Sequence, residues 1–351
     1  MRAVLLHGHG GFEQLQYRDD VPVPTPAAGE VLIRVGAAAV NNTDINTRIG
    51  WYSKAVSGGT ATAGLDAQRQ AHDAAWSGAA VRFPRIQGAD CCGRIVAVGS
   101  AVDAACIGER VLVDPVLRPA TAAGHVGYFG SDRDGAFAEF ATVPAENACR
   151  VSSTLSDVEL ASFPCSHGAA ENMLSRAEVG AAETVLVTGA SGGVGSAAVQ
   201  LARRRGANVI ALASPAKAQV LGPLGAARVL PREADLLTEL GRESVDAVID
   251  VVGGAGFPTL LEILRRGGRY AVAGAIAGAV VELDLRTLYL KDLRLLGCTV
   301  FETVMFQRLL GYIERGEIRP LVSATYPLRA IVAAQGEFLK KSHPGKIVLT
   351  L

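Results

Sequence analysis

The chain has 351 residues, of which 49% are apolar and 19% charged, and this predicts about two globular domains. Its 34 basic side chains balance 34 acidic ones, so no whole-chain charge favours a nucleic acid or an anionic membrane as a partner. The longest apolar stretch, Tyr270–Val281, is well short of the roughly 18 residues of a membrane helix. The N-terminal residues lack a signal-peptide core and the six cysteines form no C-x-x-C pair, so we expect a cytoplasmic protein with reduced thiols.

Residues 1–150 are expected to be rich in β-strands. Short apolar runs alternate there with Gly, Pro and Asp, and such regularly spaced short strands predict a barrel-like or sandwich module. The expected strands are Val4–Leu6, Val31–Val40, Gly93–Val98, Arg110–Val113 and Ala136–Val143.

Residues 51–84 interrupt this pattern with a long segment that is rich in Ala, Gly and Ser. A segment of this length between strands is unusual unless it is functional or mobile. A short helix is expected at Asp66–Ala75, and the role of the insertion stays open.

From about residue 155 onward, strands and helices are expected to alternate, which predicts right-handed crossovers and a parallel sheet. The expected strands are 184–188, 208–213, 227–230, 246–251, 269–273 and 294–298, and the expected helices are 157–177, 193–205, 215–224, 233–241 and 257–266. The last elements, which we expect to return to the first module, are a helix at 304–315, a strand at 322–326, a helix at 328–340 and a strand at 346–351.

Residues 184–195 combine a β-branched strand, a glycine-rich turn and the start of a helix. The run matches the dinucleotide fingerprint G-x-G-x-x-G with Ala190 in the first glycine's place. Glycines there permit a tight turn, close approach of the backbone to a pyrophosphate and close helix packing, and the helix N-terminus attracts phosphate. A strand–turn–helix without a ligand is the alternative. The predicted dinucleotide-binding residues are Gly189, Ala190, Ser191, Gly192, Gly193, Val194 and Gly195.

The end of the next strand distinguishes between two cofactors. NAD sites carry an acidic residue about 20 residues past the glycines, which binds the ribose hydroxyls. Here the strand ends in Ala213-Ser214-Pro215-Ala216-Lys217, which contains no acid. A carboxylate at this position would repel the 2′-phosphate of NADP(H), whereas a hydroxyl and an ammonium would bind it. Ser214 and Lys217 therefore predict NADP(H). Arg232 is a second cationic candidate, and a merely solvated Lys217 is the alternative.

Several motifs in a fixed order resemble those of the medium-chain dehydrogenase/reductase superfamily, and in particular its zinc-independent quinone oxidoreductase branch. They are Pro26-x-x-Gly29-Glu30-Val31-Leu32-Ile33, Val40-Asn41-Asn42-Thr43-Asp44, Pro84-x-x-x-Gly88-Ala89-Asp90-x-x-Gly93, Gly108-x-Arg110-Val111, Gly135-Ala136-Phe137-Ala138-Glu139 and Gly345-Lys346-Ile347-Val348-Leu349. The resemblance covers nearly the whole chain and implies an α/β fold. It implies a GroES-like β-rich catalytic domain from residues 1–154 and 301–351, and a Rossmann domain with a doubly wound parallel sheet at 155–300.

The resemblance also places further residues at the cofactor. It implies that the loop after the last Rossmann strand holds the nicotinamide carboxamide, and that residues after the two preceding strands line the ring and the ribose. Ordinary core packing is the alternative for these apolar positions. The residues concerned are Val251, Gly274, Ala275, Cys298, Thr299 and Val300.

Zinc-dependent members of the superfamily bind a catalytic metal through Cys, His and Cys, and by resemblance these positions fall at Asn41, Ala89 and Cys165. A catalytic zinc needs three protein ligands and an open position, which Asn and Ala do not supply. We therefore expect no metal. An improvised site that uses Cys165, His167 and Asp90 is the alternative.

Without a metal, reduction of a quinone or an α,β-unsaturated carbonyl is easier than oxidation of an alcohol, because hydrogen-bond donors can stabilise the charge that arrives with the hydride. The candidate catalytic residues are Asn41 as a donor, Tyr52 as a proton donor and His167 as a proton relay. Each has a structural alternative, namely a turn-stabilising Asn, a packed loop Tyr and a buried His. Trp51, Tyr52, Trp76 and Phe83 either belong to an acceptor pocket or lid, or anchor the 51–84 loop.

The leading hypothesis is an NADPH-dependent reductase of a small quinone or enone substrate. The alternatives are a zinc-type alcohol dehydrogenase and a nucleotide-binding sensor with little turnover. We expect no nucleic-acid or membrane partner, and the resemblance implies a homodimer or homotetramer.

Overall fold

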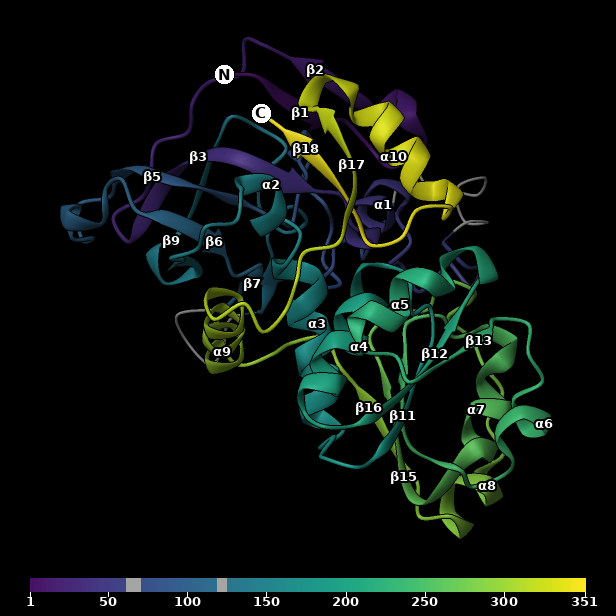
Figure 1. Ribbon diagram of the computed structural model, residues 1–351. Coiled ribbons are helices and arrows are strands. Elements are labelled where there is room, and N and C mark those ends of the chain that lie inside the picture. Colours follow the sequence, from purple (N-terminus) through teal and green to yellow (C-terminus); the bar gives the residue numbers. More distant parts are fainter. Residues whose placement is uncertain (61–70, 119–124) are drawn as a thin grey trace. The chain divides into compact units, whose positions relative to one another are not determined.

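The computed structural model describes residues 1–60, 71–118 and 125–351, which form two compact units (Figure 1). Unit 1 contains the N-terminal part of the chain to Cys165, except residues 57–60, together with Glu302–Leu351. Unit 2 contains residues 57–60 and Ser166–Phe301. The units therefore divide at 165/166 and 301/302. The boundaries expected from the sequence were 154/155 and 300/301. Of the helix expected at Asp66–Ala75, residues 66–70 lie outside the described residues and 71–75 form turns and bends.

Unit 2 is built on one sheet whose six strands are all parallel, in the order β13-β12-β11-β14-β15-β16. The strands are β11 (Thr184–Val187), β12 (Asn208–Ala213), β13 (Arg228–Pro231), β14 (Val245–Asp250), β15 (Leu264–Val272) and β16 (Arg294–Gly297). The order runs outward from β11 in one direction and from β14 in the other. In doubly wound sheets a dinucleotide binds at the carboxyl ends of the strands where this reversal occurs. The predicted Rossmann sheet is confirmed.

The helices of unit 2 cover this sheet, with α4 against β11, β12 and α5, and α7 against β15 and α6 (Figure 1). They are α4 (Gly193–Arg204), α5 (Ala218–Leu224), α6 (Leu236–Leu240), α7 (Phe257–Ile263) and α8 (Leu285–Leu290). The single helix expected at 157–177 is instead two helices, α2 (Asp157–Leu160) and α3 (Pro164–Arg176). Pro164 explains the break, since proline starts a helix readily but cannot continue one.

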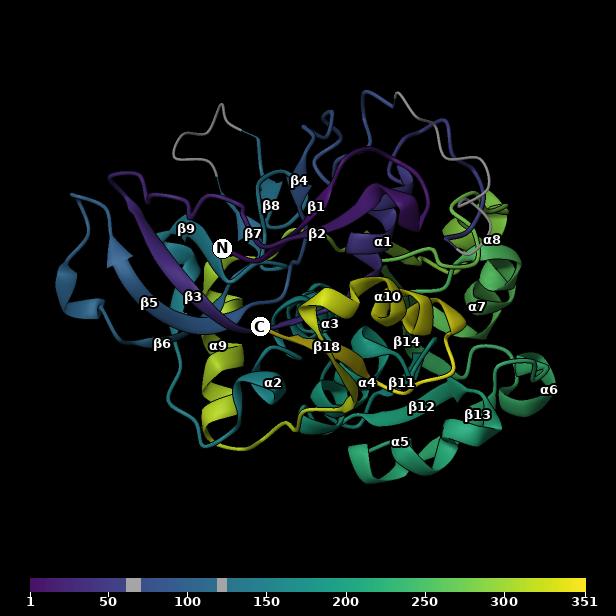
Figure 2. The ribbon, with the colours of Figure 1, turned by 90° about the horizontal axis from the view of Figure 1, so that it is seen from above.

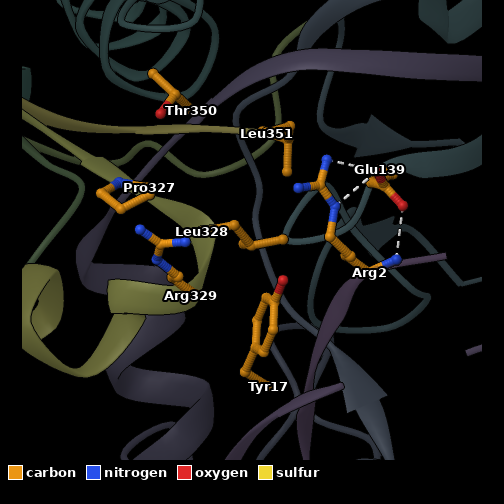
Figure 3. Close-up of a pocket in the computed structure, with 8 residues that line it drawn as sticks. All are labelled: Arg2, Tyr17, Glu139, Pro327, Leu328, Arg329, Thr350 and Leu351. Atoms are coloured by element: carbon orange, nitrogen blue, oxygen red, sulfur yellow. Dashed lines mark hydrogen bonds and ion pairs between the residues drawn. The ribbon is translucent and has the colours of Figure 1, made fainter. Parts of the chain in front are cut away.

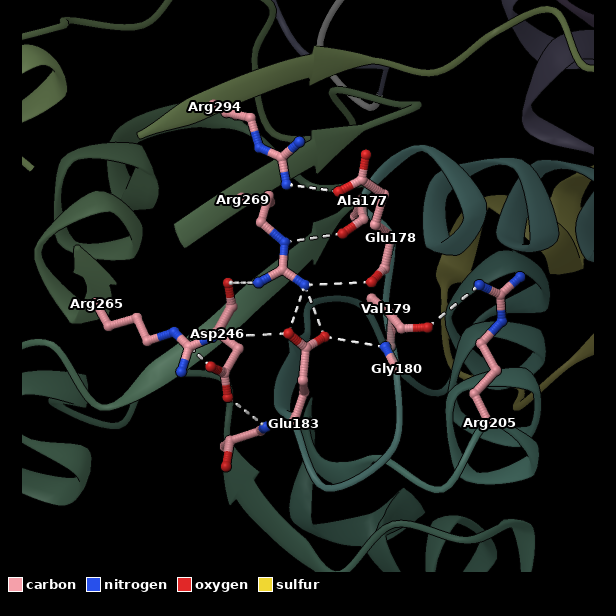
Figure 4. A network of polar contacts seen from close by, with 11 residues as sticks. Ala177, Glu178, Val179, Gly180, Glu183, Arg205, Asp246, Arg265, Arg269 and Arg294 are labelled. Atoms are coloured by element: carbon pink, nitrogen blue, oxygen red, sulfur yellow. Dashed lines mark hydrogen bonds and ion pairs between the residues drawn. The ribbon is translucent and has the colours of Figure 1, made fainter. Parts of the chain in front are cut away.

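A buried arginine joins β14, β15 and the loop before β11 at the amino-terminal end of the sheet (Figure 4). Arg269, only 4% exposed, donates from Nε to the Ala177 carbonyl at 2.8 Å and from Nη1 to the Asp246 carbonyl at 3.1 Å. Its Nη2 lies 2.6 Å from Glu183 Oε2. This network lies at the opposite end of the strands from the glycine turn, so we assign it to the scaffold.

Unit 1 is mainly antiparallel, with a sheet in the order β10-β6-β5-β3-β18-β17 and β9 also paired with β3 (Figure 2). Its strands are β3 (Glu30–Ala39), β5 (Cys92–Val98), β6 (Arg110–Val113), β9 (Phe140–Pro144), β10 (Ala148–Arg150), β17 (Val322–Pro327) and β18 (Lys346–Thr350). Because β18 pairs with β3, the end of the chain completes the first module, as predicted. The run expected as a strand from Ala136 becomes β9 only from Phe140.

Smaller elements complete unit 1. They are the sheet β2-β1-β4 (Leu15–Arg18, Ala3–Leu6, Arg85–Ile86), the pair β7 (Val116–Leu117) and β8 (Gly127–Tyr128), and the helices α1 (Asn42–Ile49), α9 (Thr303–Glu314) and α10 (Ile331–Lys340). Across residues 1–60, 71–118 and 125–351, no helix combines the length and apolar character that crossing a bilayer requires.

Candidate active site

The glycine turn of unit 2 lies between the end of β11 and the start of α4, at the reversal of strand order. Gly189 has a φ of +53°, a left-handed conformation that favours glycine. Gly192 precedes the helix in an extended conformation, and the first helical bond runs from Ser196 N–H to its carbonyl at 2.9 Å. The N–H groups of the first helical turn, Gly193 to Gly195, have no carbonyl one turn back to bind. The residues therefore fit the pyrophosphate of a dinucleotide.

Gly195 sets the distance between α4 and the turn. An alanine Cβ there would lie 2.2 Å from the Gly189 carbonyl oxygen and 2.6 Å from Ala190 Cα, both backbone atoms. Gly195→Ala is therefore expected to push α4 away, with a strain of about 1–3 kcal/mol and a loss of dinucleotide affinity of roughly tenfold or more. Fluorescence titration with NADPH measures this loss. Gly222→Ala, which meets nothing within 4 Å, is the control; equal affinity of both variants would contradict the assignment.

Asp250 organises the loop at the carboxyl end of β14 and joins it to β11 and β15. This fully buried carboxylate accepts hydrogen bonds from the Thr188 and Tyr270 hydroxyls and, at 2.8 Å, from Val252 N–H. The loops after the two strands are joined by a bridge between Gly253 and Gly278.

The cofactor positions predicted after the last three strands lie at these carboxyl ends. Val251 is buried and Gly274 lies beside its carbonyl, while the Cys298 N–H bonds to the Val272 carbonyl at 2.9 Å. Thr299 and Val300 follow Cys298 as exposed residues, and Ala275 is half-buried. The topology thus brings the predicted positions to one edge of one sheet.

Ser214, Lys217 and Arg232 follow the adjacent strands β12 and β13, so they belong to the same edge. Burial, together with the positive charge of Arg232, lowers the pKa of Lys217, which indicates that the two cations lie close together. Arg232 is exposed and its Nε lies 3.0 Å from Glu233. Glu233 is the first acidic residue after the glycine turn. Two cations, and one acidic residue that pairs with Arg232, therefore follow these two strands.

In unit 1, the buried Asn41, Asp90 and Lys346 form a polar group with the half-buried Cys165, named here the Asn41 cluster. Lys346 Nζ lies 2.8 Å from Asp90 Oδ2, and the two side chains are 5% and 0% exposed. The same ammonium donates to Asn41 Oδ1. Asp90 Oδ1 accepts the Cys165 N–H at 2.7 Å.

The Asn41 amide is fully engaged within this cluster. Its Nδ2 donates to Asp90 Oδ2 at 2.9 Å and to the Ala39 carbonyl at 3.1 Å, while its Oδ1 accepts from Lys346. These partners fix the orientation of the amide. To act as a donor toward an acceptor oxygen, Asn41 would have to give up one of these bonds, so its predicted catalytic role stays a prediction.

Asp44 and Tyr52 lie next to this cluster around α1. The Asp44 carboxylate accepts from the backbone N–H groups of Asn41 at 2.8 Å and Gly88 at 3.0 Å, so it braces the loop. Burial raises the pKa of Asp44 to about 7, against the lowering effect of Asn41 N–H and the Lys346 charge. The Tyr52 hydroxyl donates to Thr43 Oγ1 at 3.0 Å, and burial raises its pKa to about 12.

Cys165 connects the cluster to two aromatic rings. The Tyr128 hydroxyl donates to Cys165 Sγ at 3.2 Å, and the Trp76 ring stacks on Tyr128 at a centroid distance of 4.7 Å and an angle of 25°. Burial, together with the Asp90 charge, raises the pKa of Cys165 to about 12, so the thiol is protonated at neutral pH. Across the described residues, no group of three or more His, Cys, Asp or Glu is arranged to hold a metal ion.

His167, the third predicted catalytic residue, belongs to unit 2. It is 3% exposed in α3, and its Nδ1 lies 3.1 Å from Ser166 Oγ. Asn41 and Tyr52 therefore share a unit with Cys165, while the relay role of His167 stays a prediction.

A pocket of about 120 Å³ lies elsewhere in unit 1, between β2 and the turn that precedes α10 (Figure 3). It is lined by Arg2, Tyr17, Glu139, Pro327, Leu328, Arg329, Thr350 and Leu351. Arg2 is bound there by Glu139 at 2.6 Å, which neutralises its charge. None of the predicted site residues lines this pocket, so we do not assign the reaction to it.

Lys346 and Tyr128 were absent from the predicted site. Lys346 begins the buried strand β18, where a lysine in an apolar run is the one local signal. Tyr128 carries no such signal, because its partners Trp76 and Cys165 lie 52 and 37 residues away.

Comparisons with known proteins agree with both units. The family model of the alcohol dehydrogenase GroES-like domain matches residues 27–153, and that of zinc-binding dehydrogenases matches residues 193–315. An acryloyl-coenzyme A reductase of Metallosphaera sedula is 31% identical over 364 aligned positions that span 100% of both chains. The quinone oxidoreductase of Rattus norvegicus is 28% identical, with 100% of this chain and 98% of that protein covered. A crystal structure from Sinorhizobium meliloti 1021 that bears the name alcohol dehydrogenase is 49% identical, with a TM-score of 0.89 and coverage of 100% and 96%.

Proposed function

The chain belongs to the medium-chain dehydrogenase/reductase superfamily, and we propose that it is an NADPH-dependent reductase of quinones or α,β-unsaturated carbonyl compounds that works without a catalytic metal. Relatives named acryloyl-coenzyme A reductase and quinone oxidoreductase support this acceptor class. Both names describe reduction of a double bond conjugated with a carbonyl group, or of a quinone.

The proposal that no catalytic metal takes part rests on the lysine ammonium of the Asn41 cluster. Of the three positions that the resemblance assigns to zinc, Ala89 has no ligand atom and Asn41 Oδ1 accepts from Lys346. Cys165 alone is one ligand, whereas a catalytic zinc requires three.

The choice of NADPH rests on the charges after β12 and β13. Lys217 and Arg232 repel each other, and a bound 2′-phosphate dianion would relieve that repulsion. Ser214 adds a hydroxyl at the start of the turn that contains Lys217. An acid that would bind the ribose diol is missing from the sequence between Ala213 and Arg232.

When bound, the nicotinamide cofactor supplies the hydride, and a proton completes the two-electron reduction of the acceptor. The chain binds the pyrophosphate through Gly192–Gly195 and orients the nicotinamide end through the loops that Asp250 holds. Tyr52 is the candidate proton donor in this proposal. Its hydroxyl is bonded to Thr43, and its raised pKa keeps it protonated across the physiological range.

The test is consumption of NADPH and of NADH by the purified protein with a panel of quinones, enones and enoyl thioesters, beside oxidation of simple alcohols. We expect acceptor-dependent NADPH consumption and little alcohol oxidation. Zinc-dependent alcohol oxidation would favour the dehydrogenase alternative. Tight NADPH binding without turnover on any acceptor would favour a sensor.

We also propose that the protein pairs through the edge of the unit 2 sheet. β16 is the last strand of the sheet order, and nearby α8 exposes Leu285, Tyr289 and Leu290 at 63%, 62% and 57%. Uncovered edge strands with exposed apolar neighbours favour association.

Leu290→Lys is therefore expected to halve the mass of the wild-type oligomer, which for a dimer gives a species of 36.4 kDa. Light scattering after gel filtration measures this mass. Val332→Lys, at a residue of unit 1 that is 43% exposed, is the control and should keep the wild-type mass. A wild-type mass for Leu290→Lys would contradict this interface.

A further inference from the structure

The return arm of the 51–84 insertion, residues 71–80, is held firmly against the 128–132 turn of unit 1. Trp76 N–H donates to Ser131 Oγ at 3.0 Å, and Ser77 Oγ donates to Asp132 Oδ1. Ser131 Oγ is in turn bonded to Thr47 Oγ1 of α1 at 3.0 Å. This arm therefore has a defined place beside the elements that carry the Asn41 cluster.

The two ends of the insertion are also joined to each other. Lys54 N–H donates to Asp73 Oδ2 at 3.0 Å, which joins the start of the insertion to its return arm. Ala74 and Ala75 are 0% and 1% exposed, so the arm is packed into unit 1. The sequence left two functions open for Trp76, namely a loop anchor and part of an acceptor pocket. The contacts described so far are compatible with both.

What distinguishes Trp76 is the residue on which its ring stacks. Its indole lies nearly parallel to the Tyr128 ring, whose hydroxyl bonds to Cys165 Sγ at 3.2 Å. Cys165 N–H bonds to Asp90, and Asp90 to Asn41 and Lys346. A continuous series of contacts thus runs from the insertion to the Asn41 cluster.

We propose that Trp76 is a specificity-determining residue: its ring is held by stacking on the buried Tyr128 and offers its other face to flat, conjugated acceptors. This inference rests on the proposed function. Offset stacking on this ring face favours a planar quinone over a small aliphatic enone. Because the arm is fixed by hydrogen bonds at both ends, the ring face is preorganised and its selectivity costs little ordering on binding.

Kinetics with two acceptors test the proposal, namely 1,4-naphthoquinone as the flat acceptor and methyl vinyl ketone as the small one. Trp76→Ala is expected to lower kcat/KM for naphthoquinone by about tenfold, mainly through KM, and to change that for methyl vinyl ketone less than about threefold. Trp76→Phe keeps a ring and should restore most of the loss. Tyr17→Ala, at a surface aromatic residue of the same unit, is the control and should resemble the wild type.

Equal losses on both acceptors, or a loss that Trp76→Phe does not restore, would show that Trp76 is structural and overturn the proposal. A second measurement does not require turnover. The chain has two tryptophans, so in Trp51→Phe the emission comes from Trp76 alone. Naphthoquinone should quench the Trp76 emission saturably, and if the enzyme turns this acceptor over, the half-saturating concentration should lie near the KM for naphthoquinone. Absence of saturable quenching would contradict the proposal even if the Trp76→Ala variant fails to fold.

These outcomes are separable from failure of the proposed function. If the wild type consumes no NADPH with any acceptor, the reductase assignment fails, while the quenching titration still decides whether a flat acceptor binds at Trp76. If the wild type is active and its acceptor preference is independent of Trp76, the reductase assignment stands and this inference fails.

Discussion

Replacement of Lys346 by methionine is expected to lower the free energy of unfolding by about 3–5 kcal/mol. The substitution leaves the fully buried Asp90 carboxylate without its cation and Asn41 Oδ1 without a donor. Removal of one partner from a buried ion pair costs far more than the pair contributes, because the remaining charge is stranded away from water. Urea denaturation followed by circular dichroism measures the change.

Lys340→Met is the matched control, since Lys340 forms a pair of the same 2.8 Å length with Glu337 but is 68% exposed. A much smaller loss is expected there, because solvent screens an exposed pair. The double variant Lys346→Met/Asp90→Asn should be less destabilised than the sum of the two single variants, because each single change strands the other group. If Lys346→Met were no more harmful than Lys340→Met, the buried pair would not have the strength that we assign to it.

The second large effect concerns the choice of cofactor. We expect Lys217→Ala and Arg232→Ala each to weaken NADPH binding about tenfold, and the double variant to weaken it roughly 100-fold, since a hydrogen bond to a charged group contributes about 1.5–3 kcal/mol. NADH affinity should change little, because NADH has no 2′-phosphate for these cations to bind. Calorimetric titration of both nucleotides measures the two affinities.

Arg242→Ala removes another exposed cation of unit 2 and serves as the control. It should leave the ratio of NADPH to NADH affinity unchanged. Equal losses for both nucleotides in the Lys217/Arg232 double variant would mean that these residues support the fold or the pyrophosphate, and that the preference for NADPH arises elsewhere.

The parallel sheet was predictable because its strands are buried on both faces and contain continuous apolar runs, as in Val185–Val187 and Ala247–Ile249. Strand β2 (Leu15–Arg18) escaped prediction because only its first residue is buried. Helix α1 (Asn42–Ile49) has a polar sequence whose residues are buried by tertiary packing, so apolar periodicity could not reveal it.

The candidate site divides in the same way. The glycine turn and the residues after β12 are local in sequence, and the order of the strands brings them to one edge of the sheet. The Asn41 cluster joins residues up to 305 positions apart, and no local pattern shows that the Lys346 ammonium meets Asn41. The sequence could therefore suggest that zinc ligands are missing. Only the fold shows that the Lys346 ammonium donates a hydrogen bond to Asn41 Oδ1 at one of those positions.

The most direct test of the account is NADPH-dependent reduction by protein whose metal content has been measured after exhaustive treatment with a chelator. We predict undiminished quinone or enone reduction with far less than one zinc ion per chain, and no gain when zinc is added. Loss of activity on chelation, with recovery when zinc is restored, would contradict the proposal that the reductase works without a catalytic metal.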